Sequence, residues 1–372
     1  MNLKIAVLPG DGIGPEVIQQ AIRCLEAIEE SFDHTFSYKE AAVGALGIET
    51  VNDPLPQKTL ELCKNSDAIL FGAIGNRQFD HNLDTRLRPE HGLLKLRKEL
   101  DLFANIRPVK AYKPLYDRSP LKKHIVENTD FIIYRELTGG IYFGEKKTWD
   151  QGRKASDVCE YSEKEISRIA HLAFKSARNR RKKLTLIDKA NVLESSLLWR
   201  RVVSAIGESY PEVNLEFCYV DHAAMRLVLQ PNSFDVILTD NMFGDILSDE
   251  ASVISGTIGL LPSASIGAKN VLFEPIHGSF STAKGKNIAN PIAAILSAAM
   301  LLEHFSLFEE AMVIREGVDR ALTKGIVTPD VNNKTKYGTS HVGDFIADFI
   351  VDHHDEVTMN DENIGLGRST II

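Results

Sequence analysis

The chain has 372 residues, of which 44% are hydrophobic and 25% charged, a composition typical of globular proteins long enough for two domains or one large one. Its formal net charge of -8 gives no support to a nucleic-acid-binding protein. Because the overall charge repels anions, an anionic substrate would have to be bound by a local cluster of basic side chains.

Short apolar runs alternate along the chain with amphipathic segments. The runs that predict strands cover residues 4–8, 67–72, 101–109, 130–137, 183–188, 214–221, 234–240 and 270–275. The segments that predict helices cover residues 15–30, 93–100, 162–179, 193–209, 222–230, 243–256 and 290–305. This alternation is typical of the α/β class with a largely parallel sheet.

Three further segments depart from the alternation. Residues 139–161 are Gly-rich and irregular, which indicates an arm or a small antiparallel element. Residues 327–340 predict a turn region before a last helix, and residues 361–372 are expected to be poorly ordered.

The four cysteines lie far apart and form no C-x-x-C pair. Their spacing indicates buried free thiols in a reducing compartment, and neither a disulfide framework nor a zinc site. The apolar run at the N-terminus is too short for a signal peptide, and the most apolar stretch, residues 292–302, is too short to span a bilayer. We therefore expect a soluble, cytoplasmic protein in which residues 292–302 form a core or subunit-contact helix.

The segment LPGDGIGPEV, residues 8–17, follows a predicted strand and opens a predicted helix. The dinucleotide-binding pattern G-x-G-x-x-G would need a glycine where Pro15 stands. No acidic residue ends a clear second strand, where a ribose would be bound. These features exclude a standard Rossmann unit and leave a tight glycine turn as the alternative.

Three arginines fall in or near apolar segments that predict strands. Arg97 lies in LRKEL, Arg107 in FANIRP and Arg135 in IIYREL. The planar guanidinium suits carboxylates because it donates two parallel hydrogen bonds. A single buried arginine is usually structural, but three of them indicate a pocket for a polycarboxylate.

Two proton-transfer candidates also follow predicted strands. Tyr142 comes after a Gly-Gly turn next to the strand of Arg135, and Lys189 comes just past the apolar run LTLID. A desolvated lysine can act as a base and a tyrosine as a general acid. A solvated lysine and a packed tyrosine are the structural alternatives.

The segment DNMFGDILSDEA, residues 240–251, carries four carboxylates. Asp245 and Asp249 are four residues apart, so on a helix they share a face and repel each other unless a cation lies between them. With Asp221, near another strand end, they could form an all-oxygen site for Mg²⁺ or Mn²⁺. The alternative is a helix N-terminus enriched in acids, which accounts better for Asp245 than for Asp249.

Taken in order, these segments resemble the β-decarboxylating dehydrogenases of (R)-hydroxy acids, the isocitrate and isopropylmalate dehydrogenase family. The resemblance runs from about residue 3 to about residue 350 and is carried by GDGIGPEV, LRKELDLFANIRP, RELTGGIYFG, DKANVL, NMFGDILSDEAS, GLLPSASIG, EPIHGS and GKNIANP. Residues 88–98, RPEHGLLKLRK, resemble the isopropylmalate branch.

The resemblance implies an α/β fold of two domains that is not a standard Rossmann fold. The cofactor-side domain would be discontinuous, comprising residues 1–103 and 256–372. The second domain, residues 104–255, would carry the arm, the metal ligands and the dimer interface. The active site would lie in the cleft between the domains.

The resemblance also implies roles for individual residues. Lys189 and Tyr142 would be catalytic. Substrate would be bound by Arg97, Arg107, Arg135, Asp221, Glu90, Leu93, Leu94 and Val192. Mg²⁺ or Mn²⁺ would be bound by Asp221, Asp245 and Asp249. NAD would be bound by His277, Gly278, Ser279, Gly285, Ile288, Ala289 and Asn290.

The implied reaction is the oxidative decarboxylation of (2R,3S)-3-isopropylmalate to 4-methyl-2-oxopentanoate with reduction of NAD⁺, in leucine biosynthesis. The metal would polarise the new ketone and stabilise the enolate left when CO₂ departs. The resemblance further implies a homodimer with shared active sites, in which Lys189 and Asp221 enter from the neighbouring subunit.

One position departs from the family pattern. NAD-dependent members commonly have an Asp in the loop equivalent to residues 278–285, where it binds the adenine ribose. Here that loop reads GSFSTAKG, with Thr282 at the aligned position and Lys284 nearby. The Lys-Tyr pair usual for NADP⁺ in the isocitrate branch is not seen, so NAD⁺ is the expected cofactor.

Two alternatives stay open. The substrate could be another malate, such as tartrate, 3-methylmalate or homoisocitrate, although Leu93 and Leu94 favour an apolar substituent. The protein could also be a non-catalytic regulatory subunit that binds ligand. Such a subunit should have lost a catalytic or metal-binding residue, and all the expected ones are present.

Overall fold

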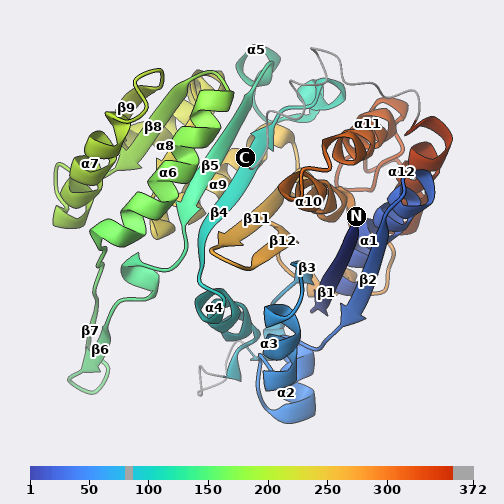
Figure 1. The fold of residues 1–372 in the computed structure, drawn as a ribbon, viewed down its shortest axis with the longest axis horizontal. Helices are drawn as coiled ribbons and strands as arrows, with labels where there is room; N and C mark the ends of the chain where they lie inside the picture. The colour runs from blue at the N-terminus through green and yellow to red at the C-terminus, as the bar shows by residue number, and fades with distance from the viewer. Residues whose placement is uncertain (80–86, 355–372) are drawn as a thin grey trace.

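The structure, a computed structural model, describes residues 1–79 and 87–354 and shows one large sheet with helices on both faces (Figure 1). The expected poor order of residues 361–372 concerns a segment outside the described residues. The strands are β1 (Asn2–Gly10), β2 (Thr35–Glu40), β3 (Ala68–Ala73), β4 (Leu102–Lys110), β5 (Asp130–Glu136), β6 (Lys146–Trp149), β7 (Lys154–Asp157), β8 (Lys183–Asp188), β9 (Asn214–Tyr219), β10 (Val236–Thr239), β11 (Pro262–Gly267) and β12 (Val271–Pro275).

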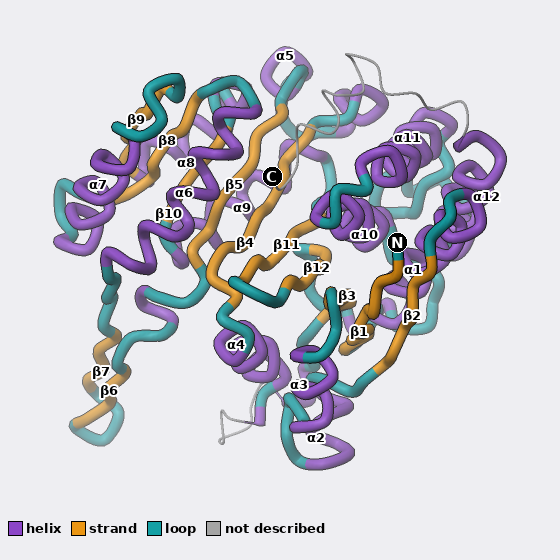
Figure 2. Tube along the Cα trace, viewed as in Figure 1, coloured by secondary structure: helices purple, strands orange, loops and turns teal. Residues whose placement is uncertain are grey.

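All the predicted helices are present, with shifts at their ends, as Figure 2 shows in purple. The helices are α1 (Gly14–Ser31), α2 (Ala45–Val51), α3 (Gln57–Lys64), α4 (Pro89–Glu99), α5 (Lys123–Val126), α6 (Glu163–Asn179), α7 (Glu194–Gly207), α8 (Val220–Leu229), α9 (Asn241–Ser252), α10 (Ile292–His304), α11 (Phe308–Lys324) and α12 (Thr339–His353). The sequence interpretation missed α2, α3, α5, α11 and the strands β2 and β11.

The main sheet has the order β2-β1-β3-β12-β11-β4-β5-β10-β8-β9. Its outer pairs are parallel, whereas β11 runs antiparallel to both β12 and β4, and β4 runs antiparallel to β5. The α/β class is therefore confirmed, and the antiparallel centre is a feature that the sequence did not predict. Antiparallel pairing matters here because it sets side chains of β4 directly opposite those of β5.

Side chains of the strands alternate between two apolar layers, as the period of two requires. On β1, Ile5 and Val7 pack with α1 and α10, whereas Ala6 and Leu8 pack with α3 and α4 on the other face. The side chains of β5, β10 and β8 are also divided between two apolar layers. One layer includes α6, and the layer on the other face includes α8 and α9. The inner strands are thus buried on both faces, which explains their continuous apolar runs, whereas the edge strands β2 and β9 are partly exposed.

Helix α10 is buried along nearly its whole length, so residues 292–302 form a core helix, as one of the two predicted alternatives states. No helix within residues 1–79 and 87–354 is both long and apolar enough to cross a bilayer.

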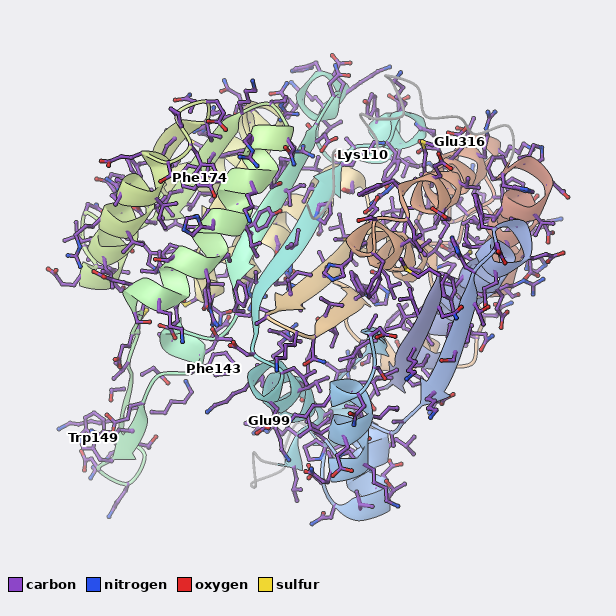
Figure 3. All side chains as sticks on the ribbon, in the orientation of Figure 1. Glu99, Lys110, Phe143, Trp149, Phe174 and Glu316 are labelled. Atoms are coloured by element: carbon purple, nitrogen blue, oxygen red, sulfur yellow. The ribbon has the colours of Figure 1, made fainter. Side chains whose placement is uncertain are left out.

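Residues 139–161 contain the antiparallel hairpin β6–β7, which confirms the expected small antiparallel element. The hairpin projects from the body of the chain, and its residues, including Trp149, are exposed (Figure 3).

The predicted boundary between residues 103 and 104 falls inside β4. The strands β2, β1, β3, β12 and β11 come from the predicted first domain, and β5, β10, β8 and β9 from the predicted second. We propose that the two domains meet where β11 pairs with β4.

The glycine turn between β1 and α1 is filled by the chain's own backbone. A Cβ on Gly12 would lie 2.0 Å from the carbonyl oxygen of Ser279, and one on Gly14 would lie 2.1 Å from that of Pro9. The N–H of Ile13 donates a hydrogen bond of 2.8 Å to the Ser279 carbonyl. The turn is therefore a close backbone contact between two loops, in agreement with the tight-turn interpretation.

We expect Gly12→Ala to lower the free energy of unfolding by about 3 kcal/mol or more, because the new Cβ would overlap the Ser279 carbonyl in addition to straining a left-handed backbone. Gly285→Ala is the matched control: its φ is +72° against +59° for Gly12, but in the described part of the chain nothing beyond its two neighbours lies within 4 Å of its Cβ position. The control should lose only about 1 kcal/mol. Urea denaturation measures both losses, and equal losses would contradict the tight contact.

Candidate active site

Helix α9 directs one polar face toward the antiparallel pair β4–β5. Asn241, Asp245 and Ser248 follow each other at helical spacing and share this face. Gly244 allows the close approach, because a Cβ there would lie 2.6 Å from Cγ of Arg135. The helix therefore brings a carboxylate, an amide and a hydroxyl onto the sheet.

Arg107 and Arg135 project from β4 and β5 toward this face and are 6% and 3% exposed. Arg135 donates to the Asn241 side-chain oxygen at 3.1 Å through Nε and at 2.8 Å through Nη2, and it donates to Asp245 through Nη1. Arg107 donates to the hydroxyl of Ser248. The two predicted carboxylate-binding arginines are thus brought side by side under α9.

The positive charge of this pair is balanced by the carboxylates of α9. Arg107 Nη2 lies 3.8 Å from Asp245, and its Nη1 lies 3.9 Å from Asp249. Burial, with the neighbouring charge of Arg135, lowers the pKa of Arg107 to about 9, and burial also lowers the pKa of Arg135. Both guanidiniums stay charged at neutral pH. Their positive charge offsets the repulsion between Asp245 and Asp249.

Arg97 reaches the same region from α4. Its Nη2 donates to Glu274 on β12 at 2.8 Å, and both side chains are largely buried. Its Nε is buried and has no hydrogen-bond partner. A buried unpaired donor costs free energy, so Arg97 has capacity for an acceptor supplied by a ligand.

Tyr142 lies at the end of the short helix η4 (Gly140–Tyr142) and contacts the same carboxylate. Its hydroxyl donates to Asp245 at 3.0 Å, and its ring lies 5.8 Å from the Arg135 guanidinium carbon. Burial raises the pKa of Tyr142, and the negative charge of Asp245 raises it further. The phenol therefore keeps its proton at neutral pH, as a general acid must.

Lys189 and Asp221 form a second cluster. The ammonium of Lys189 donates to the Asp221 carboxylate, and this bond lowers the pKa of Asp221. Asp221 lies in the first turn of α8, just after β9 ends. Among the described residues, no hydrogen bond or ion pair joins this cluster to Asp245 or Asp249.

The predicted metal ligands therefore do not form one group in a single chain. Within residues 1–79 and 87–354, no three His, Cys, Asp or Glu side chains are placed to hold a metal ion. Asp245 and Asp249 do lie together, and the exposed carboxylate of Asp249 is free to turn toward a cation. A three-carboxylate site stays a prediction that needs Asp221 from elsewhere.

The predicted residues of the isopropyl pocket differ in their surroundings. Leu93 is buried in the apolar cluster under α4, and Leu94 is half-buried. Glu90 and Val192 are exposed. Their shared role in a pocket stays a prediction.

A cleft of about 260 Å³ joins Glu90 to the predicted cofactor loop. Its lining comes from α4, from the segment after β3 and from the loop after β12: Ile74, Gly75, Asn76, Arg77, Glu90, Gly278, Ser279, Phe280, Ser281 and Thr282. The sequence interpretation missed residues 74–77. Their position at the carboxyl end of a parallel strand, where ligand sites gather, is the signal that would have indicated them.

The predicted cofactor residues divide into open and packed ones. His277 has a buried Nε2 without a hydrogen-bond partner, and burial lowers its pKa. Among the described residues, no atom outside its two chain neighbours lies within 4 Å of the Cβ position of Gly278. By contrast, the Asn290 side chain is bonded to Asp330 at 3.1 Å and to the N–H of Ile292 at 3.0 Å. His277 is therefore the better placed of these residues to accept a ligand.

The remaining predicted cofactor residues lie along the same loop. Ala289 is buried, Ile288 is partly exposed, and the N–H of Gly285 donates to Glu16 on α1. Asn287, which was not predicted, accepts from the N–H of Ser340 at 2.9 Å. These bonds fix the loop between α1 and α12.

The side chains that support the arginines were also missed. Asn105 accepts from Arg107 Nε at 2.5 Å and donates to Ser265 at 3.1 Å. Asn105 stands opposite Arg135 in the β4–β5 register, so all three side chains share a face. A polar residue two positions before a buried arginine in an apolar strand was the available signal.

Comparison with known proteins gives a consistent result. A family model described as isocitrate/isopropylmalate dehydrogenase matches residues 4–346. A 3-isopropylmalate dehydrogenase of Bacteroides fragilis (strain YCH46) is 51% identical over 352 residues, which are 94% of this chain and 99% of that protein. One of Bacillus subtilis (strain 168) is 49% identical over 346 residues, 91% of this chain and 94% of that protein.

Solved structures agree in fold. An isocitrate dehydrogenase from Methylococcus capsulatus has a TM-score of 0.84 and 31% identity, and covers 94% of this chain and 100% of its own. A β-decarboxylating dehydrogenase from Thermococcus kodakarensis in its apo form has a TM-score of 0.79 and 35% identity, and covers 96% of this chain and 100% of its own.

A pH dependence follows from Asp240, the N-cap of α9, which accepts from the N–H of Phe243 at 2.8 Å. Burial raises the pKa of Asp240 to about 7. The folded state then binds more protons than the unfolded chain between about pH 4 and pH 7, so this group's contribution to stability falls as pH rises through that range.

Asp240→Asn keeps the capping oxygen and cannot titrate. Between about pH 5 and pH 8, the free energy of unfolding of the variant should therefore rise by about 2 kcal/mol relative to that of the unmodified protein. Urea denaturation at intervals across this range measures the difference. Parallel profiles would mean that Asp240 is ionised throughout.

Proposed function

The chain belongs to the isocitrate/isopropylmalate dehydrogenase family, and from this premise we propose that it oxidises and decarboxylates (2R,3S)-3-isopropylmalate to 4-methyl-2-oxopentanoate with reduction of NAD⁺. This reaction is a step of leucine biosynthesis. The observation that carries the proposal is the cluster of Arg97, Arg107 and Arg135, which gathers buried positive charge beside the carboxylates of α9.

The arginine cluster suits the two carboxylates of a malate. Arg97 has an unpaired buried Nε, and Arg107 and Arg135 hold their positions through Asn105 and Asn241. Each guanidinium is thus oriented before substrate arrives, which lowers the entropy lost on binding. The substrate carboxylates would replace part of the contact that the arginines now make with Asp245.

A divalent cation fits the donor set of Asp245 and Asp249 together with Asp221 of a second chain. All are hard oxygen ligands of the kind that Mg²⁺ and Mn²⁺ prefer. When bound, such an ion supplies Lewis-acid chemistry at the substrate's hydroxyl oxygen, which is attached to the carbon that is oxidised. Substrate and ion would together relieve the repulsion between the two carboxylates of α9.

Two side chains of the chain itself move protons in this proposal. As the neutral amine, Lys189 would accept the proton of the substrate hydroxyl and so become an ammonium, while the hydride of the same alcohol would go to NAD⁺. Its contact with Asp221 positions the side-chain nitrogen. Tyr142 donates its proton to the carbon from which CO₂ has departed. Its raised pKa and its hydrogen bond to Asp245 keep that proton in place beforehand.

NAD⁺ is proposed to bind along the loop that starts at His277. The open Cβ position of Gly278 and the unpaired Nε2 of His277 support a ligand there, and the cleft joins this loop to Glu90 on α4, the helix that also carries Arg97. Thr282 lines the cleft where an acid would oppose a 2′-phosphate. The choice between NAD⁺ and NADP⁺ is therefore part of the first experiment.

We propose a homodimer whose active sites are shared, because one chain holds the predicted residues as two separate clusters. Apolar side chains lie exposed on the surface near the Lys189 cluster and along α7, β9, α8 and α9. They are Val192, Leu197, Phe217, Tyr219, Met225, Val228, Leu229 and Ile246. An apolar surface of this kind is typical of subunit interfaces.

We expect turnover when the protein receives Mn²⁺, 3-isopropylmalate and NAD⁺, monitored as the near-ultraviolet absorbance of reduced nicotinamide. Isocitrate, tartrate and malate, each with NAD⁺ and NADP⁺, are the comparison substrates. Burial of the isopropyl group should favour 3-isopropylmalate over malate by tens-fold, corresponding to about 2 kcal/mol. Absence of turnover from a folded protein would favour a non-catalytic subunit, and preference for NADP⁺ would assign a new role to Thr282 and Lys284.

A mixing experiment tests the shared sites. Lys189→Met and Asp249→Asn should each be inactive alone, but mixed dimers should contain one intact site. Equal mixing with subunit exchange should restore about a quarter of the full activity, because half of the dimers are mixed and each has one good site. No recovery after confirmed exchange would mean that each site is built from one chain.

A further inference from the structure

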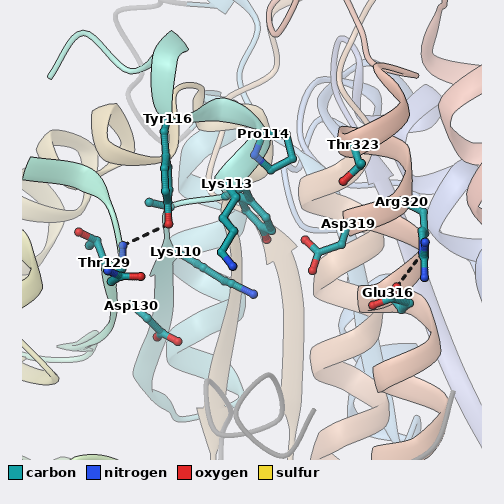
Figure 4. A pocket seen from close by; sticks show the side chains of 13 residues that line it. Lys110, Lys113, Pro114, Tyr116, Thr129, Asp130, Glu316, Asp319, Arg320 and Thr323 are labelled. Carbon is teal, nitrogen blue, oxygen red and sulfur yellow. Dashed lines mark hydrogen bonds and ion pairs between the residues drawn. The ribbon is translucent and has the colours of Figure 1, made fainter. Parts of the chain in front are cut away.

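A cavity lies at the end of β4 and β5 opposite to the arginine cluster. It has a volume of about 590 Å³ and is bounded by the end of β4, by the helix η3 (Lys113–Arg118), by residues 128–130 and by α11 (Figure 4). Lys110 lies three residues beyond Arg107, about 10 Å along the strand. The proposed reaction makes no use of this cavity.

The cavity brings together charged groups that lack partners. Lys110 and Lys113 extend from the side of β4, and Asp319 extends from α11 toward them (Figure 4). Within residues 1–79 and 87–354, no hydrogen bond or ion pair engages the side chain of Lys110, Lys113 or Asp319. The only aromatic contact of Lys110 among the described residues is with the Tyr112 ring, whose centroid lies 5.4 Å away.

Burial makes two of these unpaired charges costly. It lowers the pKa of Lys110 and raises the pKa of Asp319, and each of the two charges partly offsets the effect on the other. The Thr129 hydroxyl, in the cavity wall, is buried and has no partner either. A ligand with both an acceptor and a donor would compensate these groups, as buried charges normally require.

The carboxylates of Glu316 and Asp130, which also line the cavity, are already in ion pairs. Glu316 pairs with Arg320 at 2.8 Å, and Asp130 pairs with Arg180 at 2.7 Å. The free set is therefore two ammonium groups facing one carboxylate. A phosphate or a dicarboxylate would be repelled by Asp319, and a metal cation would be repelled by the lysines.

We propose that this cavity binds a free α-amino acid. The ligand carboxylate would meet Lys110 and Lys113, and its ammonium would meet Asp319. An α-amino acid carries these two charged groups on one carbon atom, and Tyr112, Tyr116 and Pro114 offer surface for its side chain. The bound amino acid would join Lys110 and Lys113 to α11, which lie on opposite sides of the predicted domain boundary.

Isothermal titration calorimetry of the full-length protein with L-leucine, L-glutamate and glycine tests the proposal. At least one of them should bind saturably, and acetate and methylammonium, which carry one charge each, should bind at least tenfold more weakly. Saturating 3-isopropylmalate should leave the binding unchanged, because the proposed site lies outside the substrate cleft.

Lys110→Met and Asp319→Asn should each weaken the binding about tenfold or more. The matched controls Lys39→Met and Asp348→Asn remove exposed charges outside the cavity and should have no effect. If Lys110→Met fails to fold, Lys113→Met carries the test of the cationic side, because Lys113 is exposed.

Three results would overturn the proposal. They are no saturable binding of any of the three amino acids at about 10 mM, equal binding of acetate or methylammonium, and unchanged binding in the folded cavity variants. Each of these results is independent of whether the dehydrogenase assay succeeds.

Discussion

The burial of Arg107 and Arg135 under α9 is the constraint on which the candidate site depends. Two guanidiniums in the middle of an apolar sheet are tolerated only because α9 supplies Asp245, Asn241 and Ser248 at one helical face. This arrangement in turn requires Gly244, since any larger residue would collide with Arg135. The charge that prepares the site for an anionic substrate thus also fixes the helix that carries the proposed metal ligands.

The antiparallel centre of the sheet makes that arrangement possible. Because β4 runs antiparallel to β5, Asn105 stands opposite Arg135 and supports Arg107 on the same face. The same strands continue in the other direction to Lys110 and Asp130, at the rim of the cavity beside α11. One strand pair therefore connects the arginine cluster, whose charge is balanced by carboxylates, with the cavity proposed to bind a zwitterion.

Backbone contacts fix the cofactor side of the site. The glycine turn after β1 leaves no room between Gly12 and Ser279, and the following loop is held by Glu16 and Asn287. A loop fixed in this way can present His277 and Gly278 to a ligand without ordering them on binding, which reduces the entropy cost. The glycines of this turn allow close backbone contacts within the chain. This role explains why the sequence resembles the G-x-G-x-x-G pattern without its last glycine.

The sequence by itself determined the α/β class, most helices and strands, the tight glycine turn and the candidate arginines, carboxylates, tyrosine and lysine. These features are local, because apolar periodicity and turn residues report the burial of each segment. Only the tertiary structure decided that β11 and β4 run antiparallel, that Arg107 is held by Asn105 and Ser248, and that Lys189 and Asp221 lie apart from the other cluster. Strand direction and side-chain partners depend on contacts between residues far apart in the chain, which no local pattern records.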